Sequence, residues 1–161
     1  MKTLKDIILE KLQISRHKKF LLFPKTREEL ETFINNEISQ NGYNCSLNHI
    51  DVSQIKDLSY LFYGGAAKSE YGYNFGKFNG DISRWDVSKV TDMSGMFSCS
   101  QFNGDISDWD VSSVENVFDM FYMSKFDGNL DNWELPYYCV NISYMFKKCP
   151  LQNNPPKWFK K

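Results

Sequence analysis

The side chains most able to do chemistry in this sequence are carboxylates that recur with the same neighbours. Asp51, Asp86 and Asp110 each precede Val-Ser, and Glu134 takes the same place in a later copy. If these four positions stack, their charges repel, so a bound cation or a partner with a basic surface would compensate them. Alternatively, each carboxylate accepts a hydrogen bond from a backbone N–H in the following turn, and the Asp-Val-Ser arrangement favours this interpretation.

Other residues with catalytic or metal-binding chemistry are few and scattered. The 161 residues include two histidines, His17 and His49, and four cysteines. The cysteines, at positions 45, 99, 139 and 149, lack the spacing of a zinc or redox motif, so we expect free, mostly buried thiols. The sequence contains no nucleophile elbow, phosphate-binding glycine loop or His-Glu-x-x-His motif. We therefore expect no enzyme and no cofactor.

Charge is distributed unevenly along the chain, although the net charge is only −1. Residues 78–134 contain eleven acidic and three basic side chains, a net charge of −8. Both ends are basic, and residues 147–161 contain five lysines and no acid. This distribution favours a protein partner with a basic surface over nucleic acid, which the acidic middle would repel.

Apolar segments in the chain are short. The longest apolar run, at residues 20–23, stops at Pro24, whereas a membrane helix needs roughly 18 consecutive apolar residues. Residues 1–11 interleave charged and apolar side chains, unlike a signal peptide. We expect no membrane span and a cytoplasmic protein.

An internal repeat dominates the sequence. Residues 78–88, Phe-Asn-Gly-Asp-Ile-Ser-Arg-Trp-Asp-Val-Ser, recur at 102–112 with one difference, and a third copy starts at Phe126. The interval is 24 residues, with one extra residue after Trp133 and eleven extra residues within 64–76. The predicted domains are an N-terminal helical cap, 1–42, and a repeat domain, 43–161. The repeats span 43–77, 78–101, 102–125 and 126–150, and a truncated fifth repeat spans 151–161.

Each repeat is predicted to form a short parallel strand and a short helix. The spacing of Ile82, Trp85 and Val87 is typical of a leucine-rich-repeat strand, with Trp85 and Val87 pointing inward. Asn79-Gly80 would supply the turn back. The helix is indicated by apolar residues at intervals of three and four, namely Val90, Met93, Met96 and Phe97. The predicted fold class is α/β, a short leucine-rich-repeat-like solenoid whose stacked units bury their Trp and Met columns.

Both ends of such a stack need protection. Thr26 to Glu29 form a capping box that predicts a helix through about Ser39, with apolar residues 30, 33, 34 and 38 on one face. A weaker amphipathic helix is predicted over residues 4–14. Pro155 and Pro156 would stop further pairing at the C-terminal edge, because proline has no N–H to donate.

Two features are candidates for partner recognition. One repeat position varies while its neighbours recur, which is where repeat proteins place specificity; its residues are His49, Arg84, Asp108 and Asn132. The other is the insertion at 64–76, in which glycine alternates with aromatic residues. Tyr71, Tyr73 and Phe75 either contact a partner or form a lid over the first repeat.

The unit Phe-Asn-Gly-Asp-Ile-Ser-x-Trp-Asp-Val-Ser-x-Val-x-x-Met-x-x-Met-Phe, at residues 78–97, resembles the repeat of the BspA-like leucine-rich-repeat family of bacterial surface proteins. The similarity covers about residues 43–158. It implies a non-enzymatic protein, since characterised members resemble adhesins or surface antigens that bind host proteins. Residues 8–12 are also similar to leaders of small proteins from gut Bacteroidetes and their phages.

The first functional hypothesis is a protein–protein interaction module of bacterial or phage origin. It would bind a partner through the outward face of the predicted sheet and the 64–76 loop. The alternatives are a structural or assembly subunit of a larger particle or surface layer, and an adhesin-type module. A further hypothesis is calcium binding by the Asp column. The sequence leaves the oligomeric state open.

Overall fold

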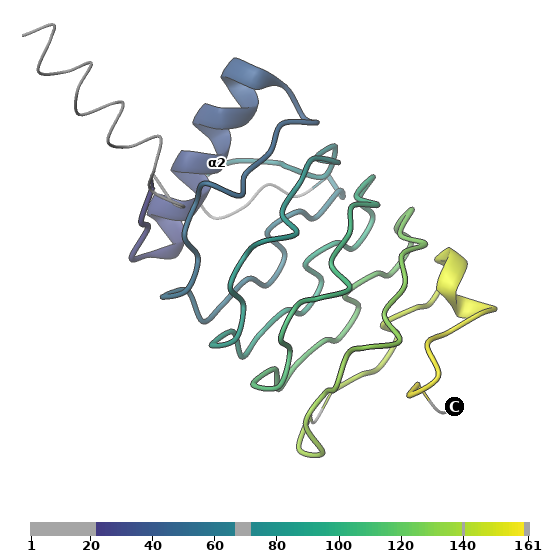
Figure 1. The fold of residues 1–161 in the computed structure, drawn as a ribbon. Helices are drawn as coiled ribbons and strands as arrows, with labels where there is room; N and C mark the ends of the chain where they lie inside the picture. The colour runs from purple at the N-terminus through teal and green to yellow at the C-terminus, as the bar shows by residue number, and fades with distance from the viewer. Residues whose placement is uncertain (1–21, 67–71, 140, 160–161) are drawn as a thin grey trace, which may run out of the picture.

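The computed structural model describes residues 22–66, 72–139 and 141–159 (Figure 1). Helix α2, Arg27–Asn41, lies at one end of the molecule, and the repeats stack away from it as successive irregular turns. The 3-10 helix η1, Pro150–Gln152, lies at the opposite end. Within these residues, the β-pairing between turns consists of isolated parallel bridges, which pair Leu22 with Ile50, Ser46 with Asp81, Asp57 with Asp92, Asp92 with Asn116 and Asn116 with Asn141.

The prediction of an α/β solenoid with one strand in each repeat is wrong, because the described residues contain no sheet. The chain bends twice where the strand was expected. Asp81 Oδ1 accepts the N–H of Ser83 at 3.0 Å, and Asp86 Oδ1 accepts the N–H of Ser88 at 3.1 Å. These side-chain bonds close turns five residues apart, which leaves no room for a strand of ordinary length.

The predicted helix in each repeat is also wrong, because this segment is a succession of turns. Gly95 and Cys99 both have a left-handed φ of 58°. A left-handed residue at every fourth position interrupts the i→i−4 hydrogen bonds of an α-helix. The equivalent residues of the neighbouring turns are left-handed too, namely Tyr60, Asp119, Met123, Tyr144 and Lys148.

The interior consists of aromatic columns that run through the stack. Trp85, Trp109 and Trp133 are at most 4% exposed, and consecutive indole rings stack 6.5 Å apart. The Trp109 indole N–H donates to the carbonyl of Ile82 in the preceding turn, at 3.2 Å. The prediction that the Trp and Met columns form the core is confirmed for the buried residues Met93, Met96, Met120 and Met145. Two stacked phenylalanine columns complete the interior, one of Phe62, Phe97, Phe121 and Phe146 and one of Phe78, Phe102 and Phe126.

Helix α2 covers the first turn, as its sequence predicts. The Thr26 hydroxyl accepts the N–H of Glu29 at 3.2 Å, so the predicted N-cap is confirmed. Leu30, Ile34 and Ile38 are buried, and the helix ends before Gly42, whose φ is 80°. The predicted helix at 4–14 lies outside the described residues, and the predicted domain boundaries stay a prediction.

The Asn-Gly pairs, which were predicted to supply the turn back, contain no glycine with a left-handed φ in the described residues. A Cβ at Gly80 would overlap the carbonyl oxygen of Cys45, and the Phe78 ring lies 2.8 Å from the same point. Glycine is therefore required by close packing between turns. The asparagines link the turns instead, since Asn79 Oδ1 accepts the N–H of Asn103 at 2.7 Å.

Candidate interaction surfaces

The recurring carboxylates hold the turns, as the second interpretation of the sequence proposed. Oδ1 of Asp51 accepts the N–H of Ser53 at 2.9 Å, and Oδ1 of Asp110 accepts the N–H of Ser112 at 3.0 Å. At Asp86, both the N–H and the hydroxyl of Ser88 donate to Oδ1, at 3.1 and 2.7 Å. Glu134, in the equivalent position of a later turn, is exposed.

These hydrogen bonds also keep the carboxylates ionised. The Ser88 hydroxyl and N–H lower the pKa of Asp86 below its ordinary value, although neighbouring Asp110 raises it. Hydrogen bonds from Ser112 lower the pKa of Asp110 in the same way. No group of three or more His, Cys, Asp or Glu side chains is placed to hold a metal ion in the part of the chain described here. The calcium-binding hypothesis for the Asp column stays a prediction.

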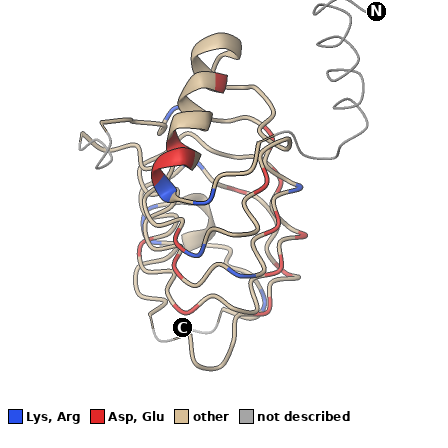
Figure 2. Cartoon of the chain, turned by 90° about the vertical axis from the view of Figure 1, so that its left-hand side faces the viewer, with Lys and Arg blue, Asp and Glu red and all other residues tan. Residues whose placement is uncertain are grey.

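A second column of acids was missed in the sequence analysis. Asp81 and Asp105 lie in successive turns, and the negative charge of Asp81 opposes the lowering of the Asp105 pKa by Ser107. Both hydrogen bonds from Ser107 go to Asp105 Oδ1, at 3.0 and 2.8 Å. The signal was present, because Gly-Asp-Ile-Ser recurs as faithfully as Trp-Asp-Val-Ser. Figure 2 shows acidic positions recurring in successive turns along the stack.

The variable repeat position lies on the surface in three of its four copies. Arg84, Asp108 and Asn132 are exposed, in successive turns of the stack. His49, in the first turn, is only partly exposed, and its Nε2 lies 3.1 Å from Glu37 Oε1. His49 is thus engaged with helix α2, whereas the other three side chains face solvent.

The described aromatic residues of the 64–76 loop pack against the core. Phe75 is 3% exposed and packs beside Phe62, with ring centroids 6.4 Å apart, so it belongs to the core and cannot contact a partner in this structure. Tyr73 is partly buried and stacks on Phe75 at 5.6 Å. This packing supports the alternative of a lid over the first repeat. Tyr71 lies outside the described residues.

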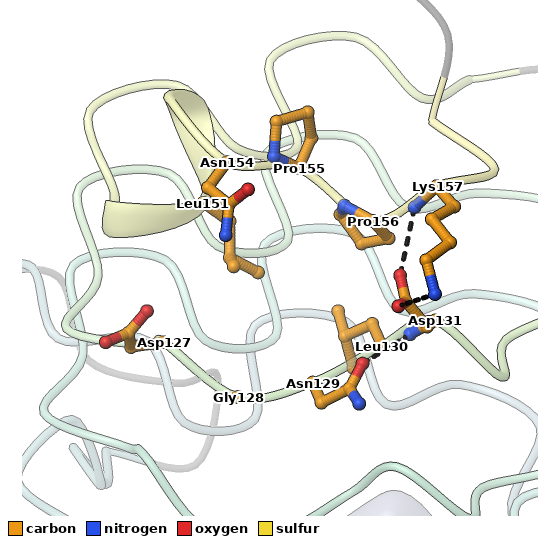
Figure 3. Close-up of a pocket in the computed structure, with 10 residues that line it drawn as sticks. All are labelled: Asp127, Gly128, Asn129, Leu130, Asp131, Leu151, Asn154, Pro155, Pro156 and Lys157. Atoms are coloured by element: carbon orange, nitrogen blue, oxygen red, sulfur yellow. Dashed lines mark hydrogen bonds and ion pairs between the residues drawn. The ribbon is translucent and has the colours of Figure 1, made fainter.

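A polar hollow of about 330 Å³ lies between the turn at 127–131 and the C-terminal segment (Figure 3). Lys157 closes one side, since its Nζ lies 2.9 Å from Asp131 Oδ2 and its N–H donates to Asp131 Oδ1 at 3.0 Å. These bonds lower the pKa of Asp131 and raise that of Lys157. Asp131 and Lys157 thus satisfy each other, and we assign this contact a structural role.

The C-terminal end of the stack exposes apolar side chains that the sequence analysis did not single out. Tyr144 is 56% exposed and Ile142 is 40% exposed. A hollow of about 490 Å³ beside them is lined by the turn at 144–148, with Leu151, Gln152 and Phe159. Tyrosine and lysine interrupt the apolar pattern in this turn, so the periodicity of apolar residues did not indicate this surface.

The cysteines take no part in these surfaces. All four are free, as predicted, but only Cys149 is fully buried. Burial raises the pKa of the Cys45, Cys139 and Cys149 thiols, which lowers their reactivity.

A protein-family model matches most of the chain. The family model described as "Mycoplasma protein of unknown function, DUF285" matches residues 30–158, from within helix α2 to the last indole column residue. The chain belongs to the DUF285 family. This family is related to BspA-like repeat proteins, whereas the leucine-rich-repeat architecture expected from the resemblance is absent from the described DUF285 chain. No curated protein and no solved structure matches the chain. The described residues contain no helix with the length and hydropathy of a membrane span.

Proposed function

We propose that this DUF285 chain is a non-enzymatic protein-binding module that engages a partner with a basic surface. The binding surface consists of the two acidic columns, residues 81 and 105 and residues 51, 86, 110 and 134, together with the exposed variable residues between them. We refer to this surface as the acidic side. The relationship to BspA-like repeat proteins, whose characterised members resemble adhesins, supports a binding role.

The arrangement of the carboxylate oxygens is the observation that carries the proposal. At Asp86 and Asp105, both hydrogen bonds within the turn go to Oδ1. Oδ2 of each accepts no hydrogen bond from the described residues, so it is available to an external donor. Because the Oδ1 bonds fix the side chain, the partner does not have to order it, and less conformational entropy is lost on binding.

The turns that carry these carboxylates are closely spaced, which suits a repetitive partner surface. Asp86 and Asp110 lie in neighbouring turns, and the adjoining Trp85 and Trp109 rings are 6.5 Å apart. The only salt bridges among the described residues involve Glu31, Glu37 and Asp131, so Asp86, Asp105 and Asp110 are not neutralised by an ion pair. Ionised, fixed carboxylates at short intervals attract Lys and Arg side chains and accelerate encounter with a basic partner.

The test uses a capped peptide of alternating Lys and Val, titrated into ¹⁵N-labelled protein at low and high salt. We expect chemical-shift changes in the amides of the acidic side, and weaker binding at high salt. The triple variant Asp86→Asn, Asp105→Asn, Asp110→Asn keeps an oxygen for each turn but removes the charge, so it should lose most of the binding. Glu28→Gln, Glu115→Gln, Asp127→Asn is the control with the same charge change at other exposed acids. Equal binding by the two triple variants, or shifts away from the acidic side, would contradict the proposal.

A further inference from the structure

On one side of the stack, a set of hydrogen bonds between turns points in the same direction, next to a few that point back to the preceding turn. In the segment that was predicted to be helical, alternate N–H groups donate to carbonyls of the next turn towards the C-terminal end. We call this the donor segment, and it spans residues 57–64, 92–99, 116–123 and 141–148 in successive turns. In the second of these, the donors Met93, Gly95, Phe97 and Cys99 reach Asn116, Phe118, Met120 and Tyr122 at 2.7–2.9 Å. In the third, the donors Val117, Asp119, Phe121 and Met123 reach Asn141, Ser143, Met145 and Lys147 at 3.0–3.1 Å.

A directed column of this kind has two chemically different ends. The first turn has carbonyl groups without a preceding donor, and helix α2 supplies one. The Arg27 guanidinium donates to the carbonyls of Asp57 and Ser59, at 3.1 and 2.9 Å. A cation from the chain itself therefore covers two of the carbonyls at the acceptor end.

In the last described turn, donor N–H groups lack a following turn that could accept their hydrogen bonds. By the repeat equivalence, the donors of this turn are Ile142, Tyr144, Phe146 and Lys148. The N–H of Lys148 donates to Gln152 Oε1 at 2.6 Å, so a side chain replaces the missing turn at this position. The backbone N–H groups of Ile142, Tyr144 and Phe146 have no acceptor among the residues that the structure describes. We call these three amides the donor edge.

The surroundings of the donor edge are apolar and basic. The 490 Å³ hollow lies against the same turn and has more apolar than polar lining. Lys147 Nζ lies 4.4 Å from the centre of the Tyr144 ring, and Lys148 Nζ lies 5.8 Å from that of Tyr122. The nearby acid, Asp119, lies close to Lys147: burial raises its pKa above the ordinary value, and the charge of Lys147 opposes this shift.

We propose that the donor edge binds an extended acidic peptide segment of another protein. Its backbone carbonyls would accept the three alternate N–H groups, as each successive turn does within the stack. Apolar side chains would enter the hollow, and carboxylates would pair with Lys147 and Lys148. This surface is separate from the acidic side and selects the opposite charge.

A second copy of the chain does not fit the donor edge. In a head-to-tail contact the required carbonyls belong to the acceptor end, where Arg27 and helix α2 already lie. In a tail-to-tail contact, N–H groups would face N–H groups, and lysines would face lysines. Both arrangements leave the three amides without acceptors, which is costly for buried backbone groups.

The test titrates ¹⁵N-labelled protein with a capped peptide of alternating Asp and Val, and with the corresponding Lys and Val peptide. We expect the Asp peptide to shift the amide resonances of Ile142, Tyr144 and Phe146 and to slow their exchange with solvent. The Lys peptide should leave these three amides unchanged. If the Lys peptide does not bind the acidic side, the proposed function is refuted, but the result of the Asp-peptide titration at the donor edge is unaffected.

Charge-reversed variants separate recognition from general attraction. Lys147→Glu, Lys148→Glu should raise the Kd for the Asp peptide about tenfold, because it removes the charge complementarity at the edge. Lys56→Glu, Lys89→Glu makes the same charge change at exposed sites elsewhere and should leave the Kd nearly unchanged. The proposal is overturned if the three amides do not respond to the Asp peptide, or if both variants weaken binding equally. It is also overturned if the amides become protected at high protein concentration without peptide, which would identify a second copy as the occupant.

Discussion

At the end covered by helix α2, carbonyl groups of the first turn meet a guanidinium, whereas at the opposite end three backbone N–H groups meet no acceptor in the described chain. The two ends differ because the alternate N–H groups of the donor segment, such as those of Met93, Gly95 and Phe97, all donate towards the C-terminal end, although the first residues of the second and third segments donate to the preceding turn. A column of parallel N–H to carbonyl bonds leaves acceptors at one end and donors at the other, as an α-helix does. An end cap must therefore match the chemistry of its end as well as cover the apolar core.

The strongest test of this comparison interrupts the stack between its ends. Trp109→Ala removes an indole that is 4% exposed and stacked between Trp85 and Trp133. We expect the free energy of unfolding to fall by about 3 to 5 kcal/mol, as for other buried Trp to Ala changes. Trp158→Ala, at the partly buried C-terminal end of the column, should cost less. Urea denaturation followed by circular dichroism measures both.

The Trp109→Ala experiment also tests whether the two ends of the stack unfold together. If the ends belong to one cooperative unit, helix α2 and the C-terminal turns lose structure in a single transition. Two separate transitions, or equal losses for Trp109→Ala and Trp158→Ala, would show that the column does not connect the ends.

The next largest effect is expected at the acceptor end. Arg27→Ala removes the donor to the carbonyls of Asp57 and Ser59 and leaves Glu31, which is 2% exposed, without its 2.7 Å ion pair. We expect a loss of about 2 to 3 kcal/mol in the free energy of unfolding, measured by urea denaturation. Adding Glu31→Gln should recover part of this loss. If Arg27→Ala lowers the free energy of unfolding by less than about 1 kcal/mol, and Glu31→Gln recovers none of this loss, the acceptor end does not need its cation.

Much of this organisation was accessible from the sequence, and the reasons differ by feature. The period of 24 residues, the inward Trp residues and the N-cap at Thr26 were predicted because each depends on side-chain type at fixed intervals. The path of the backbone was not. Apolar residues at intervals of three and four fit a helix and a succession of turns equally well, and left-handed φ angles at Tyr60, Asp119 and Tyr144 have no glycine to mark them.

The candidate surfaces were predictable to a smaller extent. The capping role of Asp86 followed from its neighbour Ser88, and Asp105 could have been found by the same rule. Phe75 belongs to a segment with the composition of a binding loop, but its side chain lies in the core. The donor edge was beyond sequence analysis, because the direction of an inter-turn hydrogen bond depends on backbone conformation, which side-chain periodicity does not report.

The sides of the stack should respond to pH more than its ends. Asp86, Asp105 and Asp110 have pKa values below their ordinary value of 3.8 because of turn hydrogen bonds. A lowered folded-state pKa stabilises the protein above the unfolded pKa, and this contribution is lost as pH falls through the folded value. We expect stability to decline below about pH 4, and the corresponding triple Asn variant to show a flatter decline.

An alanine control distinguishes charge from turn formation. Asp86→Asn should keep Tm at neutral pH, since Asn129 and Asn141 form the same turns in this chain. Asp86→Ala, which removes the acceptor, should lower the free energy of unfolding by about 1 kcal/mol. Equal Tm values for Asp86→Ala and Asp86→Asn in thermal denaturation would contradict the role of the turn bond.

The smallest effect is expected at the donor end. Gln152→Ala removes the side-chain acceptor of the Lys148 N–H, at an exposed site. We expect a loss of about 0.5 kcal/mol in the free energy of unfolding and a fourth N–H group without an acceptor beside the other three. Gln152→Glu keeps an acceptor and should retain stability. A loss for Gln152→Ala as large as that for Arg27→Ala would remove the contrast between the ends.

Amide exchange measured residue by residue by NMR tests the central claim, which is that the alternate N–H groups of the donor segment donate towards the C-terminal end and that three of them have no acceptor in the last described turn. We predict slow exchange for the alternate amides within the stack, such as Gly95, Phe97, Asp119 and Phe121. The amides of Ile142, Tyr144 and Phe146 should exchange at least about a hundredfold faster. Equal protection of these three amides in the isolated chain would contradict the account.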